Sequence, residues 1–308
     1  MSVGEGAGDT PLFEARPLPV APSLLGESPF WHPTEAALYW CDIPGKRLNR
    51  YHPQSGAHRT WDFDCEPCSA APMLGGTLLL AMRDGLWRFD PQTGRRTKLA
   101  RAPYDTTRER FNDGKADAQG RFWVGTIYEP REPALAALYR WADGKLDRMA
   151  GDVTVSNGLA WSLDGRTLYW SDTKAHRIDV LDADPADGSL SNRRPFALFP
   201  PKAPDQALDS YGGRPDGAAV DSEGCYWSAM FEGQRLLRLS PAGEVTRELR
   251  LPVRCATMPC FGDADLKTLY VTTAREKRPA EELAAQPWAG CVLRIRVDVA
   301  GLPVNFVT

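Results

Sequence analysis

One pattern of apolar and polar positions returns six times along the chain. An apolar strand is followed by a turn that carries Asp or Gly, and then by a second strand with an aromatic or β-branched centre. The clearest copies are 29–42, 115–126, 159–172 and 218–230, and two weaker copies are 71–82 and 260–273. Helical periodicity is nearly absent, and only Pro279–Gln286 is predicted to form a short surface helix.

The copies recur at the spacing of propeller blades. Equivalent places are taken by Trp40, Leu80, Trp123, Trp170, Trp227 and Val271, so the successive gaps are 40, 43, 47, 57 and 44 residues. Four-stranded blades require this spacing, and Asp-Gly pairs such as Asp164–Gly165 suit the hairpin turns between their strands. The pattern therefore predicts an all-β protein, a six-bladed β-propeller with four-stranded blades. Two β-sandwiches suit the strand content, but they do not explain one repeat running from end to end.

The last copy is one strand short. After the strands predicted at Thr268–Thr273 and Cys291–Val297, little chain remains for an outer strand. The segment Leu12–Val20 alternates adequately and is predicted to supply that strand, which closes the ring in the last blade and leaves no open sheet edge. Residues 1–11 are predicted to form a flexible tail, and residues 12–308 one propeller domain.

Four polar residues stand just before apolar strands in separate segments. They are Glu27, Asn112, Asn157 and Asp216. The first strand of each propeller blade lines the central channel, so residues just before those strands meet at one end of the channel. Two carboxylates confined there repel each other, and a hard divalent cation with oxygen ligands resolves the conflict. Any one of the four taken alone is better explained as a turn residue, as Asp42, Asp172 and Asp221 are, but four in one slot favour a shared site.

Composition narrows the classes of function. A net charge of -3 without a basic block does not favour binding to nucleic acid or to an anionic membrane, and no apolar run approaches the length of a membrane span. Seven cysteines, an odd number in a chain too long to need disulfides, fit reduced thiols in the cytoplasm. A zinc site would need four of them, Cys65, Cys68, Cys255 and Cys260. It is disfavoured because two of these lie in apolar runs suited to buried strands.

Histidine chemistry is not indicated. The four histidines, which are His32, His52, His58 and His176, fall in strand or turn contexts distant from the four polar motifs. No Ser–His nucleophile pair is visible. The longer connections Tyr128–Ala137 and Phe199–Arg214 are expected to cover the mouth of the channel and to choose the substrate.

The phrases around the four polar residues resemble those of the SMP-30/gluconolactonase/regucalcin family. They are Gly-Glu-Ser-Pro-Phe-Trp from Gly26, Arg-Phe-Asn-Asp-Gly-Lys-Ala-Asp from Arg110, Ser-Asn-Gly-Leu-Ala-Trp-Ser from Ser156 and Pro-Asp-Gly from Pro215. The resemblance runs from about Glu14 to Gly301, and phrases such as Leu-Lys-Thr-Leu-Tyr-Val-Thr-Thr from Leu266 are similar to those of bacterial sugar lactonases. The family fold is a six-bladed propeller, which the repeat count predicts independently.

The resemblance also implies a set of site residues. It makes Glu27, Asn157 and Asp216 the ligands of one divalent cation, whose identity among calcium, zinc, manganese, magnesium and ferrous iron stays open. It puts Arg110 and Asn112 at positions that contact substrate. A further substrate-contacting glutamate of the family aligns best with Pro130, whereas Glu129 stands one residue earlier. Glu129 is therefore a weaker candidate contact, and the departure suggests altered sugar recognition.

The implied function is hydrolysis of a sugar lactone. The substrate class is an aldonolactone such as glucono-, galactono-, xylono- or arabinonolactone, which opens to the aldonic acid. Asp216 would serve as ligand and general base for the attacking water. Three alternatives remain open: a divalent-cation-binding regulatory protein of the regucalcin type, a propeller that hydrolyses other esters or phosphotriesters, and a scaffold that binds protein partners on a propeller face.

Overall fold

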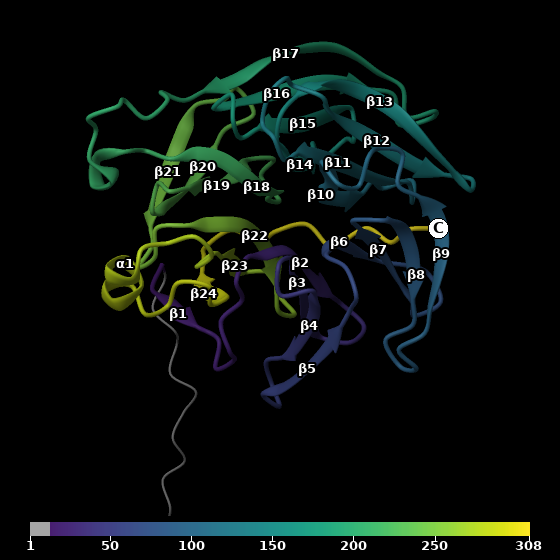
Figure 1. Cartoon of the computed structure of the whole chain (residues 1–308), viewed down its shortest axis with the longest axis horizontal. Helices are drawn as coiled ribbons and strands as arrows, with labels where there is room; N and C mark the ends of the chain where they lie inside the picture. The colour runs from purple at the N-terminus through teal and green to yellow at the C-terminus, as the bar shows by residue number, and fades with distance from the viewer. Residues whose placement is uncertain (1–12) are drawn as a thin grey trace, which may run out of the picture.

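The structure, a computed structural model, describes residues 13–308, which form six four-stranded antiparallel sheets around a central channel (Figure 1). Blade 1 consists of β2 (Gly26–His32), β3 (Ala37–Asp42), β4 (Arg47–His52) and β5 (Ala57–Asp62). Blade 2 consists of β6 (Pro67–Pro72), β7 (Leu78–Met82), β8 (Gly85–Phe89) and β9 (Arg96–Arg101). Blade 3 consists of β10 (Glu109–Ala116), β11 (Phe122–Tyr128), β12 (Ala136–Ala142) and β13 (Lys145–Val153). Blade 4 consists of β14 (Ser156–Trp161), β15 (Thr167–Asp172), β16 (Arg177–Ala183) and β17 (Leu190–Leu198). Blade 5 consists of β18 (Arg214–Val220), β19 (Tyr226–Phe231), β20 (Arg235–Leu239) and β21 (Val245–Arg250). Blade 6 is β22 (Ala256–Gly262), β23 (Thr268–Thr273), β24 (Leu293–Arg296) and β1 (Ala15–Pro17). The predicted six-bladed propeller is confirmed.

Two short helical segments interrupt the strands. They are the 3-10 turn η1 (Leu208–Ser210) and the helix α1 (Ala280–Ala285), which lies within the predicted helical segment Pro279–Gln286. Within residues 13–308, no helix has the length and apolar character needed to cross a bilayer.

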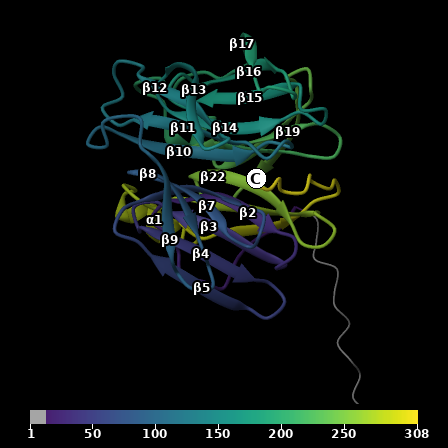
Figure 2. The same cartoon turned by 90° about the vertical axis from the view of Figure 1, so that its right-hand side faces the viewer.

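The position of a strand within its blade explains its sequence pattern. The second strands β3 and β11 are buried at every residue, because neighbouring blades cover both of their faces. The outermost strands β5 and β9 are mostly exposed and carry polar side chains. In both views β2 and β14 lie near the centre, whereas β5 and β17 lie at opposite edges of the molecule (Figure 1; Figure 2).

Four of the residues predicted to be equivalent are fully buried tryptophans whose indole N–H groups are satisfied. Trp123 and Trp227 donate to carboxylate oxygens of Asp117 and Asp221, each at 2.8 Å. Trp40 and Trp170 donate instead to serine hydroxyl groups. A buried indole needs such an acceptor, so the two aspartates act as structural anchors for the aromatic cores of blades 3 and 5.

We expect Asp221→Ala to lower the free energy of unfolding by about 3–5 kcal/mol. Asp221 is completely buried and accepts hydrogen bonds from the backbone N–H groups of Glu223 and Cys225, from Trp227 and from Arg238. Removing the carboxylate leaves these four donors without their acceptor. Urea unfolding followed by circular dichroism measures the change.

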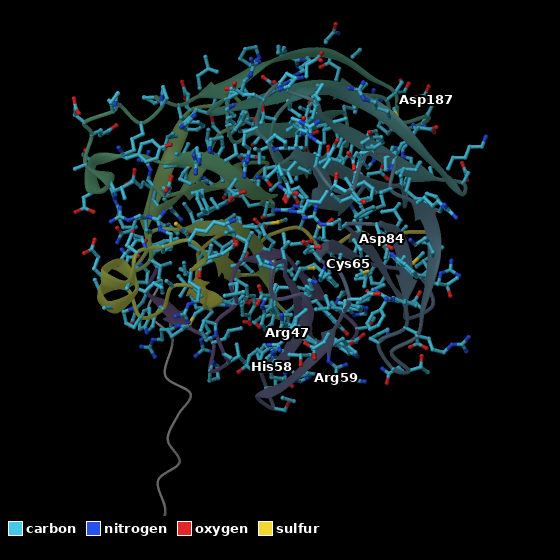
Figure 3. The ribbon with its side chains drawn as sticks, viewed as in Figure 1. Arg47, His58, Arg59, Cys65, Asp84 and Asp187 are labelled. Atoms are coloured by element: carbon cyan, nitrogen blue, oxygen red, sulfur yellow. The ribbon has the colours of Figure 1, made fainter. Side chains whose placement is uncertain are left out.

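The control is Asp187→Ala, in an exposed turn (Figure 3) where the carboxylate accepts a hydrogen bond from the backbone N–H of Ser189. This variant is expected to lose no more than about 1 kcal/mol. Equal losses in the two variants would contradict the anchoring role of Asp221.

The two chain termini close the ring. β1 pairs antiparallel with β24, with Ala15 opposite Ile295, so the N-terminal segment supplies the outer strand of blade 6 as predicted. The predicted start of this segment, Leu12, and the predicted tail 1–11 lie outside the described residues. The C-terminal segment then crosses the propeller: Ser222 donates to Ala300, Val307 to Pro72, and Thr308 to Gly120. These contacts join blades 5, 2 and 3 at the end of the channel where the first strands finish.

Candidate active site

Each first strand carries a β-bulge close to its beginning. The register shifts lie between Glu27 and Phe30, Pro67 and Ser69, Phe111 and Gly114, Asn157 and Ala160, Pro215 and Ala218, and Ala256 and Met258. A bulge re-aims the side chains next to it, and bulges are frequent beside active sites. In blade 4 the bulge contains Gly158, whose φ is +60° and whose missing Cβ would lie 2.3 Å from the hydroxyl groups of Ser171 and Tyr226. The Asn-Gly pair at Asn157 therefore follows from a close approach that only glycine permits.

A chain of hydrogen bonds joins three of the predicted site residues. Arg110 donates through Nη1 to Asn112 Oδ1 at 2.7 Å, and Asn112 Nδ2 donates to Asn157 Oδ1 at 2.8 Å. Asn157 in turn donates to the hydroxyl of Thr173 at 2.8 Å. All three residues are buried: Arg110 and Asn112 lie on β10 of blade 3, and Asn157 lies on β14 of blade 4. These bonds hold the Oδ1 atom of Asn157 in one orientation.

The two predicted carboxylate ligands lie near each other at the same end of the channel. Glu27 and Asp216 are only 6% and 5% exposed. Burial, followed by the charges of Asp216 and Asp113, raises the pKa of Glu27 well above its usual range. Burial and the charge of Asp113 raise the pKa of Asp216 to about 8, although Arg214, Arg131 and Arg110 oppose the shift. Unless a cation compensates them, these carboxylates resist ionisation.

The donor set fits a divalent cation. Asp216 accepts no side-chain or loop hydrogen bond to its carboxylate from residues 13–308, and Glu27 accepts one, at 3.2 Å, from the backbone N–H of Ser28. Together with the amide oxygen of Asn157, the carboxylates offer only oxygen atoms, as hard cations prefer. The described part of the chain has no group of three or more His, Cys, Asp or Glu residues suited to a metal, so a site here depends on the asparagine.

Asp113 is a buried carboxylate of the site that the sequence analysis did not single out. Its Oδ2 accepts from the backbone N–H of Leu159 at 2.8 Å, whereas Oδ1 is buried without a hydrogen-bond partner in the described residues. Burial raises its pKa, and the charge of Lys115 partly offsets that rise. The Asn-Asp-Gly sequence contained the signal, because Asp113 directly follows Asn112, but Asp before Gly is common in ordinary turns.

Glu129 lies in an ion-pair network at the rim of the mouth. Arg83 donates to both of its carboxylate oxygens at 3.0 Å and also pairs with Glu66 at 2.9 Å. Arg110 Nε lies 3.8 Å from Glu129 Oε1. The bond from Arg83 lowers the pKa of Glu129. A substrate contact by Glu129, which stays a prediction, would have to compete with Arg83.

One histidine, His176, contacts a loop that was predicted to cover the mouth of the channel. His176 follows β15 and hydrogen bonds through Nε2 to the hydroxyl of Tyr211 at 2.6 Å. Tyr211 belongs to the connection between β17 and β18, one of the two loops predicted to cover the mouth. The hairpin that carries His176 also carries Thr173, the partner of Asn157. Sequence spacing alone could not reveal this proximity, because the turn and the loop come from different parts of the chain.

The cysteines do not form a metal cluster or disulfides in the described residues. All seven are free thiols, and no three of them meet with other metal-binding side chains. Cys65 instead donates its thiol to Asp84 at 3.5 Å, in the area where Figure 3 labels both residues.

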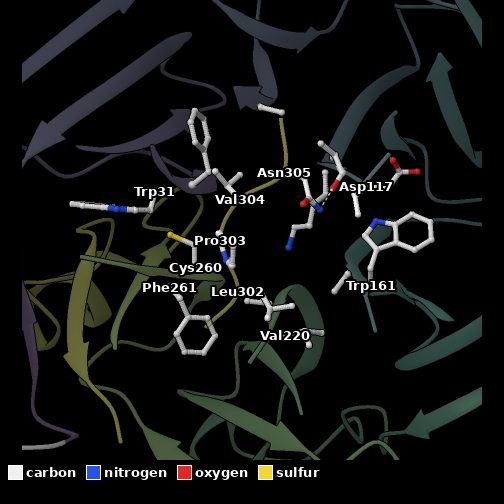
Figure 4. Close-up of a pocket in the computed structure, with 18 of the residues that line it drawn as sticks. Trp31, Asp117, Trp161, Val220, Cys260, Phe261, Leu302, Pro303, Val304 and Asn305 are labelled. Carbon is white, nitrogen blue, oxygen red and sulfur yellow. Dashed lines mark hydrogen bonds between the residues drawn. The ribbon is translucent and has the colours of Figure 1, made fainter. Parts of the chain in front are cut away.

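A separate cavity of about 320 Å³ lies at the other end of the channel. Trp31, Trp161 and Phe261 line it, and the C-terminal residues 302–305 cross it (Figure 4). The buried amine of Lys115 donates to the carbonyl of Ala218 at 2.7 Å on its wall. This lining is mostly apolar and includes none of the four predicted polar residues, so the candidate active site is the opposite, polar end.

These features define a class: a six-bladed propeller with an oxygen-rich, cation-suited site at one end of its channel. The model of the SMP-30/Gluconolactonase/LRE-like region matches residues 25–275. The chain belongs to this family.

Individual relatives extend over nearly the whole chain. It is 45% identical to a 6-deoxy-6-sulfogluconolactonase of Pseudomonas putida over 284 residues, 91% of this chain and 94% of that one. It is 33% identical to regucalcin of Oryctolagus cuniculus, with 90% and 93% covered. Among solved structures, a calcium-binding regucalcin of Agrobacterium tumefaciens superimposes with a TM-score of 0.89 at 27% identity, covering 96% of this chain and 98% of that one.

Proposed function

We propose that this protein is a metal-dependent sugar lactonase, which hydrolyses the ring ester of an aldonolactone to the aldonic acid. The observation that carries the proposal is the pair Glu27 and Asp216, buried together beside the fixed amide of Asn157. Buried carboxylates with raised pKa values and few hydrogen-bond donors destabilise the fold. Such groups cluster at functional sites, and binding of a catalytic cation would explain why they are present here. The family membership and the lactonase relative support the same reaction.

The roles of the residues follow from their positions. A divalent cation held by Glu27, Asn157 and Asp216 would polarise the lactone carbonyl and stabilise negative charge as water adds. Asp216 would accept the proton of the attacking water. Asn112 and Arg110 would orient the substrate through amide and guanidinium hydrogen bonds, and the bond between them already fixes their geometry. Glu129 is the outermost candidate contact, since its ion pair with Arg83 holds it at the rim.

The test is acid release from lactones by metal-stripped protein. Glucono-, galactono-, xylono- and arabinonolactone, together with 6-deoxy-6-sulfogluconolactone, are offered with and without added calcium, magnesium, manganese or zinc. We expect hydrolysis of at least one lactone at about 100-fold or more above the spontaneous rate, and only with a divalent ion present. A pH indicator follows the acid.

Two outcomes would overturn the proposal. Cation binding measured by calorimetry with no turnover of any lactone would favour a cation-binding regulatory protein. Turnover of aryl esters or phosphotriesters in preference to every lactone would place the protein among other propeller hydrolases.

We also place the protein in a reducing compartment such as the cytoplasm. The support for this is its seven free thiols, five of which lie within or next to buried strands. Alkylation of the thiols in freshly lysed cells, followed by mass spectrometry, tests the assignment.

A further inference from the structure

We propose that the mouth of the channel carries an anion-binding subsite, formed by Arg131 and Arg214, that selects sugar lactones with a negatively charged substituent remote from the ring ester. A sulfonate, a phosphate or a carboxylate shares this chemistry. The inference rests on the proposed function, because it names the class of substrate that the same site takes.

Arg214 stands two residues before Asp216 on β18 and is incompletely paired. Its Nη2 atom lies 3.1 Å from Glu232 Oε2, and its guanidinium packs over the ring of Phe231 at 5.2 Å. Its Nε atom is buried and has no hydrogen-bond partner in the described residues. Glu232 is shared, because Arg278 also pairs with it, at 2.8 Å. The charge of Arg214 is therefore only partly neutralised by Glu232.

Arg131 lies on the connection between β11 and β12 and is held at the mouth by its backbone. Its N–H donates to Tyr128 at 2.9 Å, and its carbonyl accepts from the side chain of Lys174. Lys174 directly follows Thr173, which bonds Asn157, so the loop is tied to the residues of the site. Arg131 also has a φ of +70°. A non-glycine residue in this region costs free energy and is often retained where function requires it.

The guanidinium of Arg131 has no acidic partner. Within residues 13–308 its side chain makes no ion pair with Asp or Glu and no side-chain hydrogen bond, and the residue keeps exposed surface. Burial of part of the side chain, followed by the charges of Arg110 and Arg214, lowers the pKa of Arg131, and the charges of Glu129 and Asp216 partly oppose that shift. Arg214 precedes Asp216 by two residues on β18, and the loop of Arg131 is tied through Lys174 to the hairpin that carries Thr173.

The acids around the mouth do not balance these arginines. Glu129 is engaged by both nitrogen atoms of Arg83, and Glu232 is divided between Arg214 and Arg278. A divalent cation would neutralise Glu27 and Asp216, two buried charges that could otherwise offset Arg131. A positive excess then faces the substrate. Guanidinium groups match the oxygens of sulfonate, phosphate and carboxylate with paired hydrogen bonds, which a neutral hydroxymethyl group cannot accept as strongly.

The experiment compares matched lactones in the metal-loaded enzyme. The neutral substrate is glucono-δ-lactone, and the charged ones are 6-deoxy-6-sulfogluconolactone, 6-phosphogluconolactone and glucaro-1,4-lactone, so that the arms separate the three anions. We expect kcat/KM for at least one charged lactone to exceed that for the neutral one by about 10-fold or more. Arg131→Gln is expected to reduce kcat/KM for that charged lactone by about 10- to 100-fold, mostly through KM, and to change the neutral lactone by less than about 3-fold.

Two further measurements identify the role of the charge. Arg131→Lys should restore part of the preference for the charged lactone, because it keeps the charge but not the planar fork. Ethanesulfonate should inhibit hydrolysis of the neutral lactone by competition in the wild type, and more weakly in Arg131→Gln. The control is Arg108→Gln, which removes an equal charge from a nearby side chain that packs over Tyr128 at 5.2 Å. It should leave the preference within about 2-fold.

The outcomes separate this inference from the proposed function. Hydrolysis of lactones without a preference for a charged substituent would overturn the subsite and leave the lactonase intact. An equal loss on neutral and charged lactones in Arg131→Gln would also overturn it, since that result means a general role in the reaction. If no lactone is hydrolysed by the metal-loaded enzyme, the proposed function itself fails.

Discussion

Asp216→Asn should abolish lactone hydrolysis and, at the same time, make the metal-free protein more stable. The substitution keeps the size of the side chain but removes the charge that would bind the cation and accept the proton of water. We expect kcat/KM to fall by at least about 10³-fold. Because burial and Asp113 oppose ionisation of Asp216, its loss relieves strain in the metal-free fold. A rise in Tm of about 3–6 °C is expected, measured by scanning calorimetry after chelation.

Asp113→Asn serves as the matched control for that variant. It removes a second buried carboxylate from the same channel and relieves the same repulsion, while an amide oxygen can still accept from Leu159. It should therefore also raise Tm, yet it should keep cation binding by Glu27, Asn157 and Asp216. Retention of more than a tenth of the activity in Asp216→Asn would remove Asp216 from the proposed chemistry.

The sequence predicted the fold because a propeller repeats one local pattern. A tryptophan in the second strand of a blade is buried between neighbouring blades, so each such position marks one blade. The number of these positions and their spacing therefore predict the number of blades. Even the closing strand could be predicted, since a blade with three strands leaves an unpaired edge that the alternating N-terminal segment could fill.

The meeting of the four polar residues could be predicted for the same reason, but the contacts around them could not. Because the blades are related by rotation, Glu27, Asn157 and Asp216 occupy equivalent positions at the start of their first strands. The partner of Glu129 is Arg83, which comes from a hairpin turn of another blade and has no such equivalent position. The exposed, strained Arg131 gives no periodic signal, because a loop is shaped by its own turns and anchors. The repeat therefore predicts the residues that follow its symmetry, and specificity depends on residues that do not.

Removal of the cation should make the stability of the protein fall steeply with rising pH. Asp216 has a pKa of about 8 in the metal-free folded state and an ordinary value of 3.8, and the pKa of Glu27 is raised as well. Between about pH 4 and pH 8 the folded state therefore holds protons that the unfolded state has released. Stability from the protonated forms is fully present at the acidic end and is lost as the pH approaches 8, by about 1.4 kcal/mol per pH unit for each group that holds its proton. Urea unfolding of chelated protein at pH 5, 6, 7 and 8 measures this slope.

A bound cation should reverse the relation, because it favours the ionised carboxylates that the empty fold resists. Its affinity should rise by about 10-fold per pH unit up to about pH 8 for each proton displaced, so saturated protein should show a much flatter stability profile. Glu27→Gln and Asp216→Asn should each reduce the slope of the chelated protein and weaken cation binding by at least about 100-fold. Parallel profiles with and without the cation would mean that these carboxylates are not its ligands. In that case burial of Glu27 and Asp216 would destabilise the fold with no compensating cation, and the metal-dependent mechanism would lose its structural basis.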